Sequence, residues 1–562
     1  MSLLAFLIAC GIGAAVGLAA RSSRWIGRLV GLAGLLAAFA AALTIDPTTS
    51  LAIGDVTLTG SRYSGFFLAC AAGSGLLLYV VGLASGRPDG LAPAALASFA
   101  GLAIAITAAD PGVALAAGAA AATAGALLIV RTTSRDSEDD GRLAEIRTIG
   151  LVAAGLGSAA ISIARPPWNG SGDGPVFALA FAILGLALAV RSGAVPFHVP
   201  AAHLGRSAAP LSPAMLLVWI PAGLALLAIS WSATTFGIRN DWLNAAVAAV
   251  QVTAVATLVL GPLAGLVHDE LDEVVAYSIV ADAGFVLLAM AARTDAAAEP
   301  ARLWLLVFIA AKTGLVAWAA ALSRAFDTSS VPRLRGWLRR TPMLGLALAV
   351  IVVATLGWPG SPVYEARSTL VRLALPGGLQ FVFAASIAIS LACYGRLLLI
   401  GLGSPTDDVR LARSELPRWR AARSDAAANA ATDAAVQPRS GEPLGGGGVR
   451  GGLGRAWRLN RTTGVSLMVV SGAALSAALA LGGLGTADAS RAGIPLDSAA
   501  HATPTRAPTQ SPVHVPTPTP LPSLAPRPTA GPSGSVAPSV SIPPTASPAP
   551  GKTSAPAQPN TD

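Results

Sequence analysis

The chain has 562 residues, of which 53% are hydrophobic and only 12% are charged, and its mean hydropathy is +0.63. These values exclude an ordinary soluble protein and predict an integral membrane protein. A net charge of +9 would suggest nucleic-acid binding in a soluble chain, but here the arginines lie in short loops between apolar segments, so no nucleic-acid role is expected.

A helix needs about 20 apolar residues to cross a bilayer, and this yardstick predicts an all-α membrane protein with about fourteen transmembrane helices. They are expected at residues 2–20, 25–45, 64–85, 91–108, 111–130, 147–165, 174–203, 209–232, 242–266, 272–293, 301–323, 341–373, 377–402 and 463–485. Cys10, Cys70 and Cys393 lie inside these apolar segments and form no C-x-x-C pair, so neither a disulfide nor a metal site is expected.

Arginine clusters indicate which side of the membrane each loop faces. They follow the first, fifth, eleventh and thirteenth predicted helices, and the loops after even-numbered helices contain few cations. Because basic loops stay in the cytoplasm, this alternation places both termini on the extracytoplasmic side of the cell (plasma) membrane. One acidic loop, 267-VHDELDE-273, also falls on the cytoplasmic side. Acidic residues have little weight in this rule.

Two segments have compositions that do not favour a packed fold. Residues 403–462 are rich in Arg, Ala and Gly, and residues 486–562 are dominated by Pro, Thr, Ser and Ala. Neither segment has enough apolar surface to bury on folding. We expect a disordered cytoplasmic loop and a disordered extracytoplasmic tail, which are separated by the last predicted transmembrane helix, 463–485.

Two predicted helices are too long for a simple crossing and are interrupted near the middle. Pro196 interrupts 174–203, and Pro359 and Pro362 interrupt 341–373. Proline removes backbone hydrogen bonds that lipid cannot replace, so such breaks persist only where protein or a water-filled cavity surrounds them. Two broken helices in the two halves of a chain are typical of transporters. The alternative is that each break is only a helix end beside a loop.

Four motifs carry a resemblance to a known family. They are 196-PFH-198, 276-AYSIVADAGF-285, 308-FIAAKTGL-315 and 334-LRGWLRRTPMLGLALAVIVVATLGWPG-360. In order and spacing they resemble the antiporter-like membrane subunits of respiratory NADH:quinone oxidoreductase (complex I), a family that includes the large Mrp cation/proton antiporter subunits. The resemblance implies two inverted five-helix repeats with discontinuous helices. It also implies N-terminal helices at 1–90 and a proton-translocation domain at 91–402.

The sequence departs from this family pattern at several positions. Arg191, five residues before the Pro-Phe-His motif, and Arg367, after the second break, stand where the family usually has lysine. Asp282 replaces a histidine, and Pro221 replaces a lysine of the eighth span. The segment 111–130 is without the glutamate that pairs with the first lysine in relatives that pump protons. These exchanges leave open whether the chain pumps.

Lys312 stands out because it and Lys552 are the only lysines among 38 basic residues. It lies about 15 Å from either end of its predicted span, at about 1.5 Å per residue, so its ammonium group cannot reach the lipid headgroups. A charge at this depth costs about 2.5–3.5 kcal/mol, and a partner is expected. Asp282 lies at a similar depth, with Tyr277 and Ser278 nearby to anchor water. We predict an Asp282–Lys312 pair, either as a proton-transfer site or as a static pair that fixes helix packing.

Four further residues are candidates for the proton path. They are Arg191, His198, Glu365 and Arg367. An arginine guanidinium keeps its proton in proteins, so the two arginines suit a field-tuning role better than a relay. Alternatively, Arg191 is a cation that reaches toward the headgroups, and Glu365 and Arg367 form a salt bridge near the outer mouth. At His198 a proton relay and a hydrogen bond to a freed carbonyl are both consistent with the sequence.

These features are interpreted as a proton-translocating, antiporter-like subunit of a complex I-type NADH:quinone oxidoreductase. The alternatives are an Mrp-type or free-standing cation/proton antiporter and a non-pumping scaffold subunit. The sequence has neither a cysteine cluster nor a convincing G-x-G-x-x-G motif, so no cofactor is expected on this chain. The resemblance implies that quinone, flavin and iron–sulfur clusters belong to partner subunits in the membrane and at its surface. Those subunits and the lipid bilayer are the expected partners.

Overall fold

The computed structural model describes residues 2–20, 23–46, 50–85, 90–110, 174–198, 211–233, 240–326, 328–404 and 465–477, with most of 113–121. Contacts divide the chain into the units Met1–Ala502 and Thr503–Asp562, and every described residue lies in the first unit. The predicted helix at 147–165 and the predicted tail at 486–562 lie outside the described residues, as do most of the helix at 111–130 and the loop at 403–462.

The described residues are mostly helical. The longer helices are α1 (Ser2–Ala19), α2 (Arg24–Leu43), α3 (Arg62–Ser85), α4 (Leu91–Thr107), α7 (Gly174–Ser192), α9 (Ile220–Ala233), α10 (Asp241–Val267), α11 (Leu271–Ala292), α12 (Ala298–Phe326), α14 (Pro342–Leu356), α15 (Pro362–Ala374), α16 (Phe381–Leu402) and Val465–Ala477. The short ones are η2 (Ala214–Trp219), η3 (Asp295–Ala297), η4 (Val331–Leu334), α13 (Trp337–Arg340) and η5 (Gly377–Leu379). Within this part of the chain, seven helices are long and apolar enough to cross a membrane. The expected helical membrane fold is confirmed.

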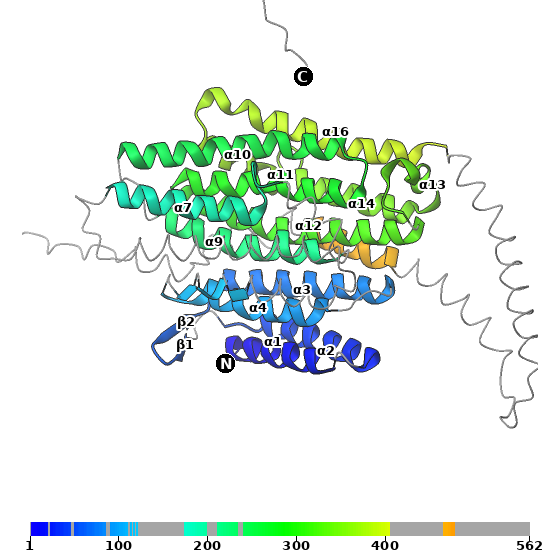
Figure 1. Cartoon of the computed structure of the whole chain (residues 1–562), viewed down its shortest axis with the longest axis horizontal. Coiled ribbons are helices and arrows are strands. Elements are labelled where there is room, and N and C mark those ends of the chain that lie inside the picture. Colours follow the sequence, from blue (N-terminus) through cyan, green and yellow to red (C-terminus); the bar gives the residue numbers. More distant parts are fainter. Residues whose placement is uncertain are drawn as a thin grey trace, which may run out of the picture. The chain divides into compact units, whose positions relative to one another are not determined.

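Helices α11 and α12 form the centre of the described unit, beside α10 (Figure 1). The apolar stretches of α11 and α12 are completely buried in protein, whereas those of α10 and α16 are only 28% buried. A helix that is hydrophobic on all sides is stable only where every face is covered. Lipid covers the open faces of the outer helices, so the two central helices are where an ionisable residue is shielded from both water and lipid.

The second predicted break is confirmed as a discontinuous helix. Helix α14 ends at Leu356, and α15 begins at Pro362, the first position of a new helix, where proline is tolerated. Gly357 and Gly360 in the connection have φ angles of 69° and 88°, which residues with a side chain rarely adopt. The Ser361 hydroxyl accepts a hydrogen bond from the Tyr364 backbone N–H and caps α15. The break therefore exposes the carbonyl end of α14 inside the protein.

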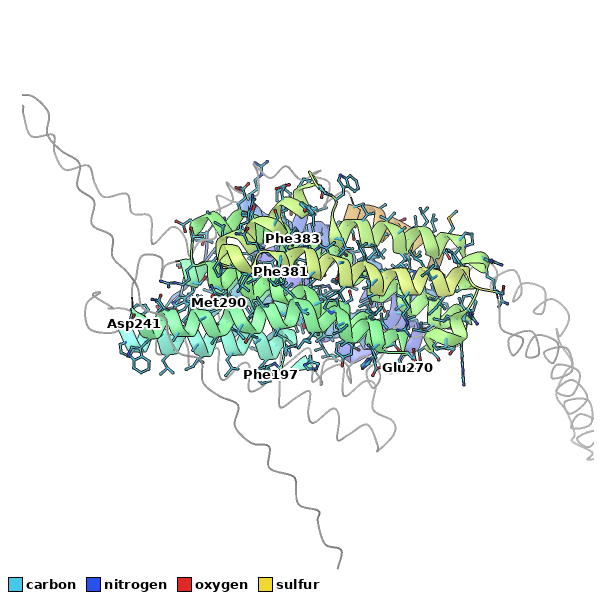
Figure 2. All side chains as sticks on the ribbon, turned by 90° about the horizontal axis from the view of Figure 1, so that it is seen from above. Phe197, Asp241, Glu270, Met290, Phe381 and Phe383 are labelled. Atoms are coloured by element: carbon cyan, nitrogen blue, oxygen red, sulfur yellow. The ribbon has the colours of Figure 1, made fainter. Side chains whose placement is uncertain are left out.

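The first predicted break is also present. Helix α7 ends at Ser192, Gly193 has a φ of 66°, and the Val195–Pro196 peptide bond is cis. The backbone N–H of Val195 donates to the Thr257 hydroxyl of α10 at 3.1 Å. In Figure 2, Phe197 lies between the end of the helices marked by Asp241 and the end marked by Glu270. Helix α7 therefore ends part-way along the neighbouring helices.

A β-hairpin between α2 and α3 departs from the all-helical expectation. Strands β1 (Ser50–Ile53) and β2 (Val56–Thr59) pair antiparallel, with Ile53 opposite Val56. Gly54 occupies the first position of the two-residue turn with a φ of 60°, which suits a tight hairpin. The prediction of an entirely α-helical chain was wrong here because the alternating Val, Thr and Leu residues of β2 were too few to register as a strand.

The loop after α10 and the loop after α12 lie at the same end of the helices. The backbone N–H of Leu271 donates to the Ser329 carbonyl at 2.8 Å, and that of Val331 donates to the Asp269 carbonyl at 2.7 Å. The Ser329 hydroxyl donates to the Glu270 carboxylate at 2.6 Å. The acidic loop and the arginine-rich loop thus face the same side. That this side is cytoplasmic stays a prediction.

Candidate functional site

The predicted Asp282–Lys312 pair lies between the two central helices. The Nζ atom of Lys312 is 2.5 Å from Oδ2 of Asp282. Lys312 is 0% exposed and Asp282 is 4% exposed. Lys312 is 14 residues from each end of α12 (Ala298–Phe326), which is about 21 Å along the helix axis. Both charges are therefore held in the interior and partnered there.

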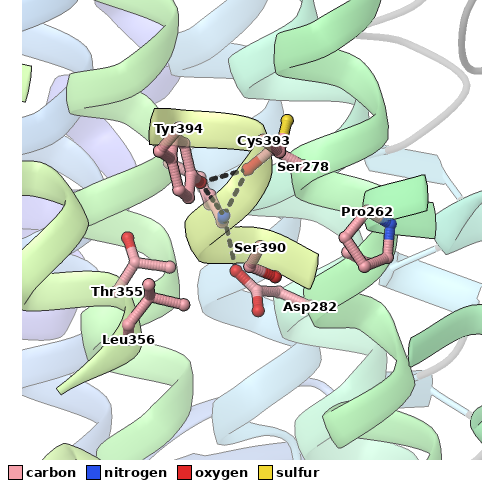
Figure 3. Close-up of a pocket in the computed structure, with 10 residues that line it drawn as sticks. Pro262, Ser278, Asp282, Thr355, Leu356, Ser390, Cys393 and Tyr394 are labelled. Carbon is pink, nitrogen blue, oxygen red and sulfur yellow. Dashed lines mark hydrogen bonds and ion pairs between the residues drawn. The ribbon is translucent and has the colours of Figure 1, made fainter. Parts of the chain in front are cut away.

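Two hydroxyl groups complete the environment of the lysine. The Lys312 ammonium donates to Ser278 Oγ at 2.8 Å and to Tyr394 Oη at 3.4 Å, and the two hydroxyl oxygens are 2.5 Å apart. Ser278 and Asp282 are four residues apart on α11, so they share one face. Figure 3 shows Ser278, Asp282 and Tyr394 facing one another, with Tyr394 contributed by α16. The ammonium group thus has three oxygen acceptors from two helices.

Tyr394 was not among the site residues predicted from the sequence. A signal existed, because the chain has only five tyrosines and this one lies in the middle of an apolar span. A buried phenol hydroxyl usually needs a hydrogen-bond partner. The hydrogen-bond partner of the Tyr394 hydroxyl depends on how α16 packs against α11. This packing could not be predicted from the sequence. Ser278, by contrast, was expected near the pair.

Arg367 is the second cation of the site. It is 0% exposed, and its Nη1 atom donates to the carbonyls of Thr355 at 2.9 Å and Leu356 at 3.1 Å. These are carbonyls that the break leaves free at the C-terminal end of α14. That end carries partial negative charge, which favours a cation there. The guanidinium carbon also lies 4.2 Å from the ring centre of Phe285.

Asp282 is shared between the two cations. The Nη2 atom of Arg367 is 3.5 Å from Asp282 Oδ1, while Lys312 binds the other carboxylate oxygen. One negative charge therefore faces two positive charges, and the cluster has a net charge of +1 when Lys312 is protonated. Glu365, predicted as a possible partner of Arg367, is instead exposed on the first turn of α15, and Arg367 points into the protein. The alternative of a Glu365–Arg367 salt bridge at the outer mouth does not form in the described residues.

A small cavity adjoins the cluster. Its lining includes Pro262 of α10, whose ring nitrogen carries no hydrogen, and the side chains of Asp282, Lys312 and Tyr394. The Thr355 hydroxyl also faces it and is buried without a hydrogen-bond partner in the described part of the chain. The polar groups of Asp282, Lys312 and Tyr394 in its lining, together with the unsatisfied Thr355 hydroxyl, suit a bound water molecule.

The candidates at the first break are placed apart from this cluster. Arg191 is 6% exposed, and its Nε and Nη2 atoms are buried without hydrogen-bond partners among the described residues. The His198 ring centre lies 6.1 Å from that of Tyr277 on α11. Among the described residues, no hydrogen bond or ion pair joins Arg191 to Asp282 or Lys312. The alternative of Arg191 as a cation that reaches the headgroups does not fit its burial.

No group of three or more His, Cys, Asp or Glu side chains within the described ranges is placed to hold a metal ion. The site is thus a cluster of ionisable and hydroxyl side chains inside a helical membrane protein. It offers proton donors and acceptors in contact, with a lysine as the group able to change charge.

The chain is similar to known membrane proteins in sequence and in fold. Residues 168–392 match the family model described as NADH:quinone oxidoreductase/Mrp antiporter, TM. The NADH-quinone oxidoreductase subunit N of Thioalkalivibrio sulfidiphilus is 26% identical over 225 residues, which cover 39% of this chain and 45% of the relative. The chain therefore spans less than half the length of this curated relative. The segment 168–392 thus matches the family that the motifs indicated, and the resemblance is confirmed.

Two solved structures share the fold. A chain of respiratory complex I from Thermus thermophilus with bound aureothin superposes with a TM-score of 0.61 at 19% identity and covers 87% of this chain and 100% of its own length. A chain of the Mrp complex from Dietzia sp. DQ12-45-1b superposes with a TM-score of 0.63 at 17% identity. It covers 90% of this chain and 97% of its own length. At these identities the likeness establishes the fold alone.

Proposed function

We propose that this chain is a proton-translocating, antiporter-like subunit of a complex I-type NADH:quinone oxidoreductase. The observation that carries the proposal is the sharing of Asp282 between a lysine, which can change charge, and an arginine, which keeps its charge. The family match over residues 168–392 supports the class of complex.

Arg367 allows Lys312 to release a proton without leaving the carboxylate alone. A buried charge that loses its only partner typically costs about 3–5 kcal/mol. When Lys312 becomes neutral, Asp282 still faces the Arg367 guanidinium, and the 3.5 Å contact has room to shorten into a full hydrogen bond. Both protonation states of Lys312 then leave every charge of the cluster partnered. A residue that takes up and releases protons needs partners for its neighbours in both protonation states. A static ion pair does not need this.

The hydroxyl groups provide the next carriers. Ser278 and Tyr394 can each donate and accept a hydrogen bond, and both contact the Lys312 ammonium. A proton that leaves Nζ moves onto the hydroxyl oxygen that accepts from it, while the hydroxyl proton moves on to the next acceptor or to water in the cavity. Lys312 is returned to its charged form by the reverse sequence from the other side.

The charge balance favours a proton over a metal cation as the transported ion. A metal ion would be a third positive charge beside one carboxylate, and hard cations need a shell of several oxygen ligands. This argues against the Mrp-type or free-standing cation/proton antiporter as the role of this cluster. The non-pumping scaffold remains the second candidate, because Arg191 and Arg367 hold their protons at positions where the family usually has lysine.

We infer the finer architecture from the same reasoning. It has about fourteen transmembrane helices with two inverted repeats, and both termini face away from the cytoplasm of a cell whose plasma membrane holds the complex. Residues 91–402 form the proton-translocation domain, with helices at 1–90 before it and a loop, a helix and a tail after it. The partners are other membrane and peripheral subunits, which carry the flavin, the iron–sulfur clusters and the quinone site.

The deciding experiment compares pumping by the complex with and without the charged pair. The complex is purified from its own membranes through a tag on this chain and reconstituted in vesicles. We expect flavin and iron–sulfur subunits to co-purify, and we expect the Lys312→Met, Asp282→Asn double variant to pump fewer protons per electron than the unmutated complex. Equal pumping by an assembled double variant would leave the scaffold role, and co-purification of small antiporter subunits would favour the Mrp-type role.

Labelling tests the proposed orientation. A cysteine introduced at Ser535 should react with a membrane-impermeant thiol reagent in intact cells, because the tail is proposed to lie outside. A cysteine at Ser424 should react only after the cells are opened. Cys10, Cys70 and Cys393 are partly or fully buried, so they should react little with the reagent. Labelling of the unmutated chain measures this background reaction. The reverse pattern of labelling would refute the assignment from arginine-rich loops.

A further inference from the structure

A second group of ionisable residues lies at the loop end of α11, and the loop that contains it is firmly held. Arg396 of α16 donates from Nη1 to the carbonyls of Leu266 at 2.7 Å and His268 at 2.6 Å, and it forms an ion pair with Asp269. The backbone pairing of this loop with Ser329 and Val331 fixes its other side. His268 therefore has a defined position rather than that of a free loop residue.

Tyr277 lies near two histidines from different elements. Its ring centre is 4.8 Å from that of His268 and 6.1 Å from that of His198. The His268 side chain is 33% exposed, and its Nε2 atom is 3.9 Å from the carboxylate of the buried Glu273. Tyr277 is itself buried. An imidazole that water can reach is thus followed inward by a phenol.

Tyr277 is linked to the Lys312 cluster through its neighbours. Gly265 of α10 lies against both Tyr277 and Cys393, and Cys393 lines the cavity beside Lys312. A Cβ atom at Gly265 would lie 3.5 Å from Tyr277 Cβ and 3.3 Å from Cys393 Sγ. The glycine thus lets α10 pack closely against both residues. Ser278, the neighbour of Tyr277 in the chain, already contacts the Lys312 ammonium.

We propose that His268 and Tyr277 form the access route by which protons reach Lys312 from the loop end of the helices. This inference rests on the proposed function. His268 Nε2 takes a proton from water, and the carboxylate of Glu273 stabilises the imidazolium. The phenol oxygen of Tyr277 accepts a proton as its own O–H proton leaves inward through water, and the imidazole returns to neutral. Further charged groups of the described residues at this end are Asp269, Glu270 and Asp272 in the same segment and Arg396 on α16, which donates to the His268 carbonyl.

Chemical rescue tests the route. In the assembled complex reconstituted in vesicles, His268→Ala should lower the proton pumping rate on the order of tenfold, since water replaces an acid–base group poorly. Added imidazole should restore much of the rate, because the vacated space is open to solvent. Tyr277→Phe keeps the ring near the two histidines, so it should slow pumping without rescue. Pumping is followed as membrane potential, because neutral imidazole crosses membranes and would distort a pH signal.

A control variant and two contrary results make the proposed access route testable. His501→Ala, which lies outside the matched residues 168–392, measures the background effect of imidazole. Normal pumping by both His268→Ala and Tyr277→Phe would overturn the route, as would a loss in His268→Ala that imidazole does not restore. These results would leave the proposed function standing if the Lys312→Met, Asp282→Asn variant still pumps fewer protons per electron than the unmutated complex. Normal pumping by that double variant removes the proposed function itself.

Discussion

Replacing Lys312 by arginine should leave the protein assembled and stop proton movement. Arginine keeps a positive charge beside Asp282, so the carboxylate stays partnered. The guanidinium does not release its proton under physiological conditions, so a relay that passes through position 312 is interrupted. The measurement is proton pumping per assembled complex in reconstituted vesicles, with electron transfer recorded in the same sample.

The matched variant Lys312→Met separates charge from proton transfer. It removes the cation but leaves Asp282 with Arg367, which is 3.5 Å away in the structure. We expect less assembled protein than for Lys312→Arg, and fewer protons pumped per electron by the fraction that does assemble. If Lys312→Arg pumped at the rate of the unmutated complex, Lys312 would be a structural cation, and the relay through this residue would have to be abandoned.

The sequence was sufficient to locate the pair but not its surroundings. Lys312 and Asp282 could be found because charged side chains in the middle of a membrane span are rare and need a partner. Two opposite charges on consecutive helices have few other possible partners. The breaks at Pro196 and at Pro359 and Pro362 were readable from proline and glycine in the same way. These are local signals, and each has one dominant physical explanation.

The role of Arg367 could not be read in the same way. Its contacts with Thr355 and Leu356 arise because α15 turns back beside the end of α14, which is a matter of tertiary packing. From the sequence, the nearer candidate partner was Glu365, two residues away. Residues two apart on a helix point in different directions, and this excludes a pair with Arg367 once the helix begins at Pro362.

Arg367→Met should reduce both stability and pumping. The carbonyls of Thr355 and Leu356 would lose their donor in the interior of the protein, at about 1–3 kcal/mol for each unsatisfied group. In the fraction that assembles, Asp282 would depend on Lys312 alone. Release of the lysine proton would then isolate a buried carboxylate at about 3–5 kcal/mol, which slows the step at least about a hundredfold. Thermal denaturation and vesicle pumping measure the two effects.

Arg372→Met is the matched control on the same helix. Arg372 is exposed, and within the described residues its one hydrogen bond is to the Thr369 hydroxyl, so its loss should change neither stability nor pumping appreciably. Arg367→Lys should fall between the two, because it keeps the charge beside Asp282 but cannot bind two carbonyls and a carboxylate with one planar group. The sharing of Asp282 predicts that the losses caused by Arg367→Met and Asp282→Asn are smaller together than their sum. Strict additivity, or full pumping by Arg367→Met, would show that Arg367 holds α14 in place without supporting the charge change at Lys312.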